Sequence, residues 1–466
     1  MRTTPPNDLP ATLGALRASG HQLVGVKAEI RANLLTALRE RRSPWIGIIG
    51  FDATVLPQLE RALIAGHDCV LLGERGQGKT RLLRSLVNLL DEWTPAIGGS
   101  ELGEHPFEPI APISVRRAAE LGDDLPVVWK HRSERYTEKL ATPDTAVADL
   151  IGDVDPVKVA EGRSLGDPET IHFGLVPRAH RGIVAINELP DLAERIQVAL
   201  LNVMEERDIQ VRGYTLRLPL DVLLVASANP EDYTNRGRII TPLKDRFGAE
   251  IRTHYPLRLA DEVALIEQEA TLTAEVPEHL LDIVARFTRL LRESSAIDQG
   301  SGVSARFAVA ATETVAAAAL RRAALTGETT AAARPIDLQS VLSVLRGKLE
   351  FATGEEGREQ EILEHLLRRA TADTARARLR GVDLTPLAEA VARHPLRTGD
   401  RVRAVDVVSA LPDVAVLTEI GQRLGAGGTE EPGPMASAAE LALELLFLTR
   451  KLAKEPSDDG NTVSYG

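Results

Sequence analysis

The sequence predicts an α/β protein with a parallel sheet, followed by two helical regions. From Trp45 to about Pro256, short apolar runs alternate with helical patterns, which is typical of a parallel sheet with helices on both faces. From Leu257 onward the pattern is helical. The composition agrees, because 44% of the residues are hydrophobic and only 3% are aromatic. A core of Leu, Val, Ile and Ala favours helices and parallel sheets over aromatic-rich β-sandwiches.

These patterns divide the 466 residues into five segments. We expect an N-terminal helical extension (1–43), an α/β domain (44–256), a helical domain (257–352), a further helical C-terminal region (353–454) and a disordered polar tail (455–466). The pattern of the sequence leaves the role of residues 361–454 open.

Three runs of the α/β domain are the clearest strands, namely Cys69–Leu72, Ile183–Ile186 and Val222–Ala226. Residues 100–175 hold many Pro, Gly and charged residues, so we expect long surface loops there.

Charge and cysteine content exclude several classes of protein. The net charge of −12 gives no global attraction to nucleic acid or to an anionic membrane surface. The single cysteine, Cys69, excludes both a disulfide within the chain and a zinc site made of several thiolates. No apolar signal core and no apolar run of roughly 18 residues is present, so we expect a soluble cytoplasmic protein without a membrane span.

Residues 73–80, Gly-Glu-Arg-Gly-Gln-Gly-Lys-Thr, match the phosphate-binding pattern G-x-x-x-x-G-K-[ST] in full. A predicted strand precedes the motif and a predicted helix follows it, which is the setting that the motif requires. The candidate nucleotide-binding residues are Gly73, Glu74, Arg75, Gly76, Gln77, Gly78, Lys79, Thr80 and Arg81.

The motif has a direct chemical explanation. Gly76 and Gly78 let the backbone curl, so that its N–H groups converge on phosphate oxygens at the positive end of a helix. Lys79 would neutralise the β- and γ-phosphates, and the Thr80 hydroxyl would bind Mg²⁺. We therefore expect ATP and Mg²⁺ as ligands.

The run GIVAINEL ends a second buried strand on Asn187 and Glu188. A site of this kind needs a carboxylate near the metal and a second one that polarises the attacking water, so Glu188 is the candidate general base. Asn187 occupies the metal side, where its carbonyl oxygen can accept a hydrogen bond from a metal-bound water without supplying negative charge. We expect weaker Mg²⁺ binding as a result. The alternative for Glu188 is a carboxylate that stabilises a helix N-terminus.

A third strand, in DVLLVASANPEDY, ends on Asn229. An amide at this place can bond both the γ-phosphate and the attacking water, and so sense which nucleotide is present. The alternative is an ordinary Asn-Pro turn.

In this order, these motifs resemble those of the AAA+ ATPases over about Trp45–Phe351. Finer features resemble the branch that contains MoxR and the magnesium-chelatase I subunits. They are the stretches FGLVPRAHRGIVAINELPDL, LLNVMEERDIQVRGYTLRLPLDVLLVASANPEDY, ITPLKDRFG and GVSAR. The second stretch includes a predicted β-hairpin, Ile209–Val211 with Tyr214–Leu218. One departure is Asn187, where most of the family has Asp.

The resemblance implies a P-loop sheet core followed by an all-α lid. It also implies a homo-oligomeric ring, usually a hexamer, in which Arg246 is the arginine finger for the neighbouring subunit's site and Arg306 is the second sensor. The segment PWIGIIGFD resembles the one that packs against adenine, so Ile48, Ile49 and Gly50 are candidates. Core packing is the alternative for that segment.

The resemblance further implies a ring-forming ATPase that remodels, activates or metal-loads a separate partner protein with a von Willebrand factor A domain. Two alternatives remain open. One is a nucleotide-gated scaffold with little turnover, which the substitution at Asn187 motivates. The other is a magnesium chelatase subunit of tetrapyrrole synthesis, although we identify no porphyrin-binding feature.

Overall fold

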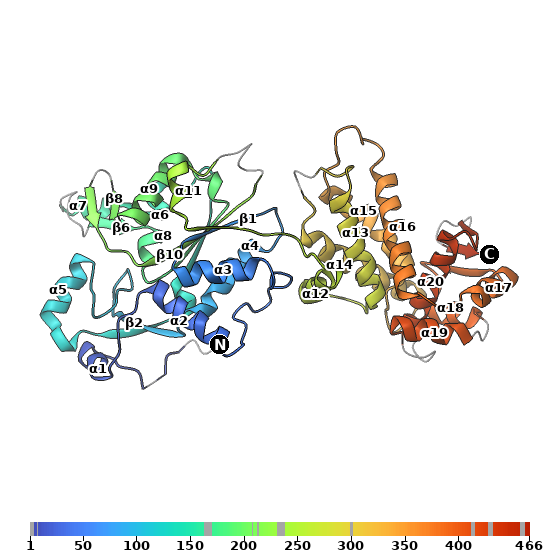
Figure 1. Cartoon of the computed structure of the whole chain (residues 1–466), viewed down its shortest axis with the longest axis horizontal. Coiled ribbons are helices and arrows are strands. Elements are labelled where there is room, and N and C mark those ends of the chain that lie inside the picture. The colour runs from blue at the N-terminus through green and yellow to red at the C-terminus, as the bar shows by residue number, and fades with distance from the viewer. Residues whose placement is uncertain are drawn as a thin grey trace. The chain divides into compact units, whose positions relative to one another are not determined.

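The computed structural model describes the chain in ten segments, which form two compact units. We call them the first unit, Met1–His254, and the second unit, Tyr255–Gly466 (Figure 1). The described residues are 4–6, 8–162, 170–206, 208–211, 214–230, 238–298, 302–411, 415–426, 432–456 and 462–466.

The first unit contains a five-stranded parallel sheet in the order β11-β1-β10-β7-β4. Its strands are β1 (Cys69–Leu72), β4 (Tyr136–Leu140), β7 (Gly182–Asn187), β10 (Val222–Ala228) and β11 (Ala249–Arg252). The predicted α/β class is confirmed, and the three strands expected from the sequence are β1, β7 and β10. Since the strands are parallel, their carboxyl ends lie along one edge of the sheet.

Alternate residues of the strands enter two separate cores, so both faces of the sheet are buried. Leu71 and Ala185 pack with helices on one face, and Leu72 and Ile186 pack with helices on the other. The first face is covered by α2 (Val26–Arg39), α3 (Val55–Ala65) and α4 (Lys79–Ser85). The second is covered by α6 (Val147–Leu150), α8 (Leu175–Arg178) and α9 (Glu194–Glu205). Figure 1 shows α2 and α3 on the opposite side of the sheet from α9. Helix α2 of the predicted N-terminal extension thus belongs to the core of this unit.

The expectation of long surface loops over residues 100–175 is wrong. This region contains β4, which is an edge strand of the main sheet. An edge strand has one partner and a partly exposed face, so its polar sequence YTEKL gives no apolar signal. The region also contains α5 (Pro112–Leu121), β3 (Val127–His131) paired with β2 (Trp93–Ile97), α7 (Pro156–Ala160), and β5 (Gly152–Val154) paired with β6 (Ile171–Phe173).

The predicted hairpin is confirmed as β8 (Asp208–Val211) paired with β9 (Tyr214–Arg217). The two residues between the strands, Arg212 and Gly213, lie outside the described residues. Among the residues that the structure describes in the first unit, the other α-helices are α1 (Leu13–Ala18) and α11 (Thr241–Arg246).

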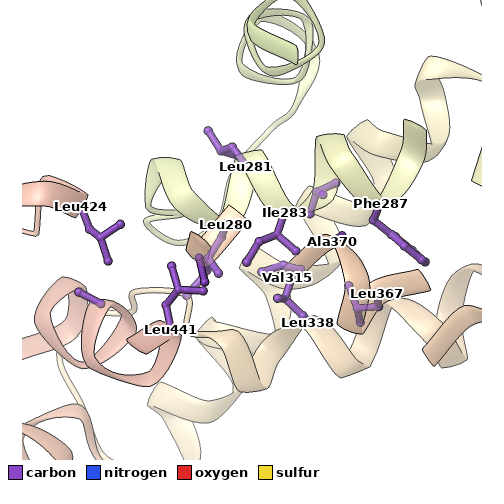
Figure 2. Close-up of a cluster of buried hydrophobic side chains, with 14 of the residues drawn as sticks. Leu280, Leu281, Ile283, Phe287, Val315, Leu338, Leu367, Ala370, Leu424 and Leu441 are labelled. Carbon is purple, nitrogen blue, oxygen red and sulfur yellow. The ribbon is translucent and has the colours of Figure 1, made fainter. Parts of the chain in front are cut away.

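The second unit is mainly helical and has a continuous hydrophobic core. Figure 2 shows part of this core, where Leu280, Leu367 and Leu441 come from helices far apart in the sequence. The core therefore includes both the predicted lid and the predicted C-terminal region. The helices are α12 (Leu259–Glu269), α13 (Glu278–Glu293), α14 (Ala305–Thr326), α15 (Gln339–Leu345), α16 (Glu359–Arg378), α17 (Thr385–Arg393), α18 (Ala404–Ala410), α19 (Ala415–Leu424) and α20 (Pro432–Leu448).

The prediction of a disordered tail is wrong for the described residues at the C-terminus. A small antiparallel sheet joins β12 (Leu396–Gly399), β14 (Thr462–Tyr465) and β13 (Lys454–Pro456). The Tyr465 hydroxyl donates a hydrogen bond to Glu444 Oε1 at 2.6 Å, and the Tyr465 ring is buried. One aromatic anchor with a satisfied hydroxyl holds a segment whose composition is polar. None of the helices in the described part of the chain is both long and apolar enough to cross a membrane.

Candidate active site

The phosphate-binding motif forms a tight turn between β1 and α4. Gly76 and Gly78 have φ values of 75° and 78°, in the left-handed region that disfavours residues with a Cβ. A Cβ placed on Gly78 would meet no atom within 4 Å, so the turn opens on free space there. At Gly73 a Cβ would lie 2.0 Å from the Thr253 hydroxyl oxygen. That hydroxyl donates to Gln77 Oε1 at 2.7 Å and ties the turn to the end of β11.

Lys79 is buried at the first position of α4 and points across the turn. Its ammonium group donates hydrogen bonds to the carbonyl oxygens of Gly73 and Glu74, the latter at 2.8 Å. It also donates to Asn229 Oδ1 at 2.7 Å. The positive charge is therefore fixed where the motif predicts a phosphate.

Asn229, at the carboxyl end of β10, connects Lys79 to the predicted general base. Its Nδ2 donates to Glu188 Oε2 at 2.6 Å. The Glu188 backbone N–H donates to Ser227 Oγ at 3.3 Å. Glu188 has a φ of 56°, a left-handed conformation that is costly for a residue other than glycine. Such a conformation is typical of functional positions held in place by their surroundings.

Asn187 lies beside Thr80, as the sequence predicted for the metal side of the site. Its Oδ1 accepts hydrogen bonds from Thr80 Oγ1 at 3.4 Å and from Ser227 Oγ at 3.1 Å. Its Nδ2 donates to Glu138 Oε1 at 2.8 Å. The carbonyl oxygen of Asn187 and the hydroxyl of Thr80 thus face each other.

This donor set fits Mg²⁺, which prefers hard oxygen ligands and retains several waters beside substrate phosphates. Thr80 and Asn187 supply such oxygens at the turn. Among the residues that the structure describes, no group of three or more His, Cys, Asp or Glu side chains is placed to hold a metal ion. A cation here would accordingly depend on the phosphates for much of its coordination.

The predicted adenine segment lies next to the start of α4. A Cβ on Gly47 would come within 2.8 Å of the Arg81 guanidinium, so Arg81 covers this segment. Ile48 packs partly against the core, in agreement with the packing alternative. Ile49 and Gly50 are half-buried, and contact between them and adenine stays a prediction.

The two predicted arginines lie in different units. Arg246 is the last residue of α11, its side chain is half-exposed, and it forms an ion pair with Glu205 of α9 in the same chain. Arg306 is an exposed residue in the first turn of α14, in the second unit. The roles of both arginines stay predictions.

Sequence reasoning missed three residues that shape the site, namely Ser227, Thr253 and Glu138. Ser227 could have been found, because it lies two residues before Asn229 and so faces the same side of β10. Glu138 could not, since its position beside Asn187 depends on the pairing of β4 with β7.

Part of the chain is similar in sequence to known proteins. The family model described as the Sigma-54 interaction domain matches residues 162–246, a range that contains Asn187, Glu188, Asn229 and Arg246. The magnesium-chelatase subunit ChlI of Nostoc sp. is 27% identical over 245 residues, which are 51% of this chain and 61% of that protein.

Two further proteins of the magnesium-chelatase group also match this chain. ChlI of Guillardia theta is 30% identical over 207 residues, covering 43% of this chain and 54% of that protein. A structure described as the complex between subunits BchI and BchD of magnesium chelatase is 22% identical, covers 69% of this chain and 98% of that one, and has a TM-score of 0.37. The chain thus spans about half to three fifths of the length of these curated relatives.

Proposed function

We propose that this chain, which matches magnesium-chelatase ChlI subunits and the Sigma-54 interaction domain model, is an AAA+ ATPase of the chelatase-like branch that binds ATP with Mg²⁺ at the phosphate turn and hydrolyses it there. The observation that carries this proposal is the single network from Lys79 through Asn229 to Glu188. It gathers a phosphate-binding cation and a candidate base at the carboxyl ends of β1, β7 and β10. Ligands of open α/β sheets bind at this edge.

In this proposal, Lys79 exchanges its bonds to the Gly73 and Glu74 carbonyl oxygens for β- and γ-phosphate oxygens. The backbone N–H groups between Gly76 and Thr80 bind the remaining phosphate oxygens. Thr80 would hold Mg²⁺ directly and Asn187 would hold it through a water. When bound, Mg²⁺ neutralises charge on the phosphate oxygens.

Glu188 accepts a proton from the water that attacks the γ-phosphate. The bond from Asn229 Nδ2 to Oε2 fixes the direction of the carboxylate. Asn229 Oδ1 also accepts a hydrogen bond from Lys79. A change in the phosphates bound by Lys79 can therefore alter the position of Glu188 through the Asn229 amide. This arrangement supports the expected sensing role of Asn229.

We propose that hydrolysis requires a ring, in which Arg246 enters the neighbouring subunit's site and Arg306 contacts the nucleotide from the lid. An arginine suits the first role because it stays charged and its planar fork matches phosphate oxygens. The half-exposed position of Arg246 supports this role. Its ion pair with Glu205 would have to open on assembly. A hexamer is the ring size that the resemblance favours.

The protein on which the ATPase acts is proposed only from the resemblance to the MoxR and magnesium-chelatase branch. We propose a client that is a separate protein with a von Willebrand factor A domain, which the ring remodels, activates or loads with metal. Two other functions each have one observation in their favour. The neutral Asn187 favours a nucleotide-gated scaffold, and the matches to ChlI favour a chelatase subunit.

The Glu188→Gln variant tests the hydrolysis proposal. We expect it to keep its affinity for ATP and to lose turnover by about a hundredfold or more, since only the proton acceptor is removed. Steady-state ATPase assays and binding calorimetry measure the two effects separately. If the wild-type chain, with or without its partner, turns over no faster than this variant, the scaffold function replaces the ATPase. Affinity capture by the variant in ATP then identifies the client.

A further inference from the structure

Glu138 lies beside the candidate metal site although it belongs to the edge strand β4. In the register of β4 and β7, Glu138 pairs with Ala185 and Leu140 pairs with Asn187. Since side chains alternate between faces, Glu138 and Asn187 are diagonal neighbours on the same face of the sheet. Glu138 Oε1 accepts from Asn187 Nδ2 at 2.8 Å, and the Glu138 side chain is only 21% exposed.

This contact fixes the orientation of the Asn187 amide. Nδ2 is engaged by Glu138, and Oδ1 therefore faces Thr80 and Ser227. A carboxylate at position 187 would have no N–H group to donate. It would also stand against the Glu138 carboxylate at hydrogen-bond distance, where two like charges repel each other strongly.

Glu138 has a second partner on the other side. Arg84, in the helix that follows the phosphate turn, donates through Nε at 2.7 Å and through Nη2 at 2.9 Å to the two Glu138 oxygens. The Arg84 side chain is 64% exposed, so solvent screens its charge far more than that of Glu138. A line of contacts thus runs from the surface through Arg84 and Glu138 to Asn187.

We propose that Glu138 is the acidic residue of the magnesium site, transposed from β7 to the neighbouring strand β4. It supplies the negative charge that Asn187 lacks, and it turns the Asn187 carbonyl oxygen toward Thr80. Glu138 is a positioning residue that acts through Asn187, and Arg84 moderates its charge. This inference rests on the proposed function, because it concerns the metal that accompanies ATP.

The test uses the full chain in a Glu188→Gln background, saturated with ATP, with Mn²⁺ as a spectroscopic probe of the metal site. Glu138→Gln keeps an acceptor for Asn187 but removes the charge, so we expect Mn²⁺ affinity to fall roughly three- to tenfold. Arg84→Gln leaves the Glu138 charge unbalanced, so we expect Mn²⁺ affinity to rise about two- to threefold. ATP affinity without metal should stay unchanged in both variants.

The matched control is Glu250→Gln, because Glu250 lies on the opposite edge strand β11 and is also partly buried in an ion pair, 3.2 Å from Lys244. It should leave Mn²⁺ affinity unchanged.

A double-mutant cycle adds Asn187→Asp. In the Glu138→Gln background, Asn187→Asp restores the negative charge and should raise Mn²⁺ affinity about fivefold. Beside an intact Glu138 carboxylate, the same substitution should raise Mn²⁺ affinity much less, because the two carboxylates repel each other.

The opposite signs separate this inference from a structural role, since loss of a merely structural ion pair would weaken Mn²⁺ binding in both single variants. Equal losses in Glu138→Gln and Arg84→Gln, or additive effects in the cycle, would overturn the inference and leave the proposed function intact. A wild-type chain that binds no ATP would overturn both.

Discussion

The phosphate turn of the first unit and the core of the second unit hold buried charges in contrasting ways. At the phosphate turn, neutral amides separate the charged groups from their neighbours: Asn229 lies between Lys79 and Glu188, and Asn187 lies between the Thr80 hydroxyl and Glu138. An amide both donates and accepts, so it can hold a cation and a carboxylate in place without neutralising either. The charges at the phosphate turn are thereby kept for a ligand.

In the second unit, opposite charges neutralise each other directly. Arg322 Nη2 donates to Asp337 Oδ2 at 3.0 Å and to the Ala332 carbonyl oxygen at 2.6 Å. The Arg334 backbone N–H donates to the same Asp337 oxygen at 2.8 Å. The Arg322 and Asp337 side chains are 3% and 2% exposed. Burial of charge alone therefore does not indicate a functional site, and what matters is how the charge is balanced.

The largest effect that we expect from this contrast is on stability. Asp337→Ala would leave the Arg322 charge buried without its main partner and cost about 3–5 kcal/mol of unfolding free energy. Chemical denaturation of the full chain measures it. The control is Asp406→Ala, which removes a carboxylate from the exposed pair with Arg403 and should change stability little. Equal effects of the two substitutions would contradict the structural role assigned to the buried pair.

A smaller effect concerns the arginine finger. Glu205→Gln removes the charge that holds Arg246 in its own chain, so we expect basal ATP turnover of the assembled protein to rise by at most about fivefold. Glu250→Gln serves as the control, because Glu250 pairs with Lys244 of the same helix α11. A fall in turnover for Glu205→Gln would mean that the pair positions Arg246 productively.

A last effect depends on pH. Burial lowers the pKa of His279 from its ordinary 6.5 to about 4, and its Nε2 lies 2.9 Å from Ser437 Oγ. A group with a lowered pKa in the folded state contributes stability above its unfolded pKa and loses it as pH falls toward the folded value. The gap in melting temperature between wild type and His279→Gln should therefore narrow between about pH 6.5 and pH 4. A difference in melting temperature that stays constant between pH 6.5 and pH 4 would contradict the lowered pKa of His279.

Much of the first unit could be predicted from the sequence, because its signals are local. The phosphate motif, the strand ends at Glu188 and Asn229, and the hairpin are each contained in a short stretch of residues. The position of Glu138 depends instead on which strand pairs with β7, and pairing is a property of the whole sheet.

The second unit could be predicted only as helical. Its shared core and its small sheet depend on contacts between distant residues, such as Tyr465 with Glu444. A polar tail has no periodic apolar pattern, so composition alone indicated disorder there.

The proposed function depends on Lys79 and its partners forming a site for ATP with Mg²⁺. Titration calorimetry of the full chain with Mg·ATP, beside the Lys79→Met variant, tests it most directly. We predict saturable heat for the wild type and at least a hundredfold weaker binding for the variant, because the ammonium group bonds the phosphates. Equal binding by both proteins, or none by the wild type in any assembly state, would contradict the account.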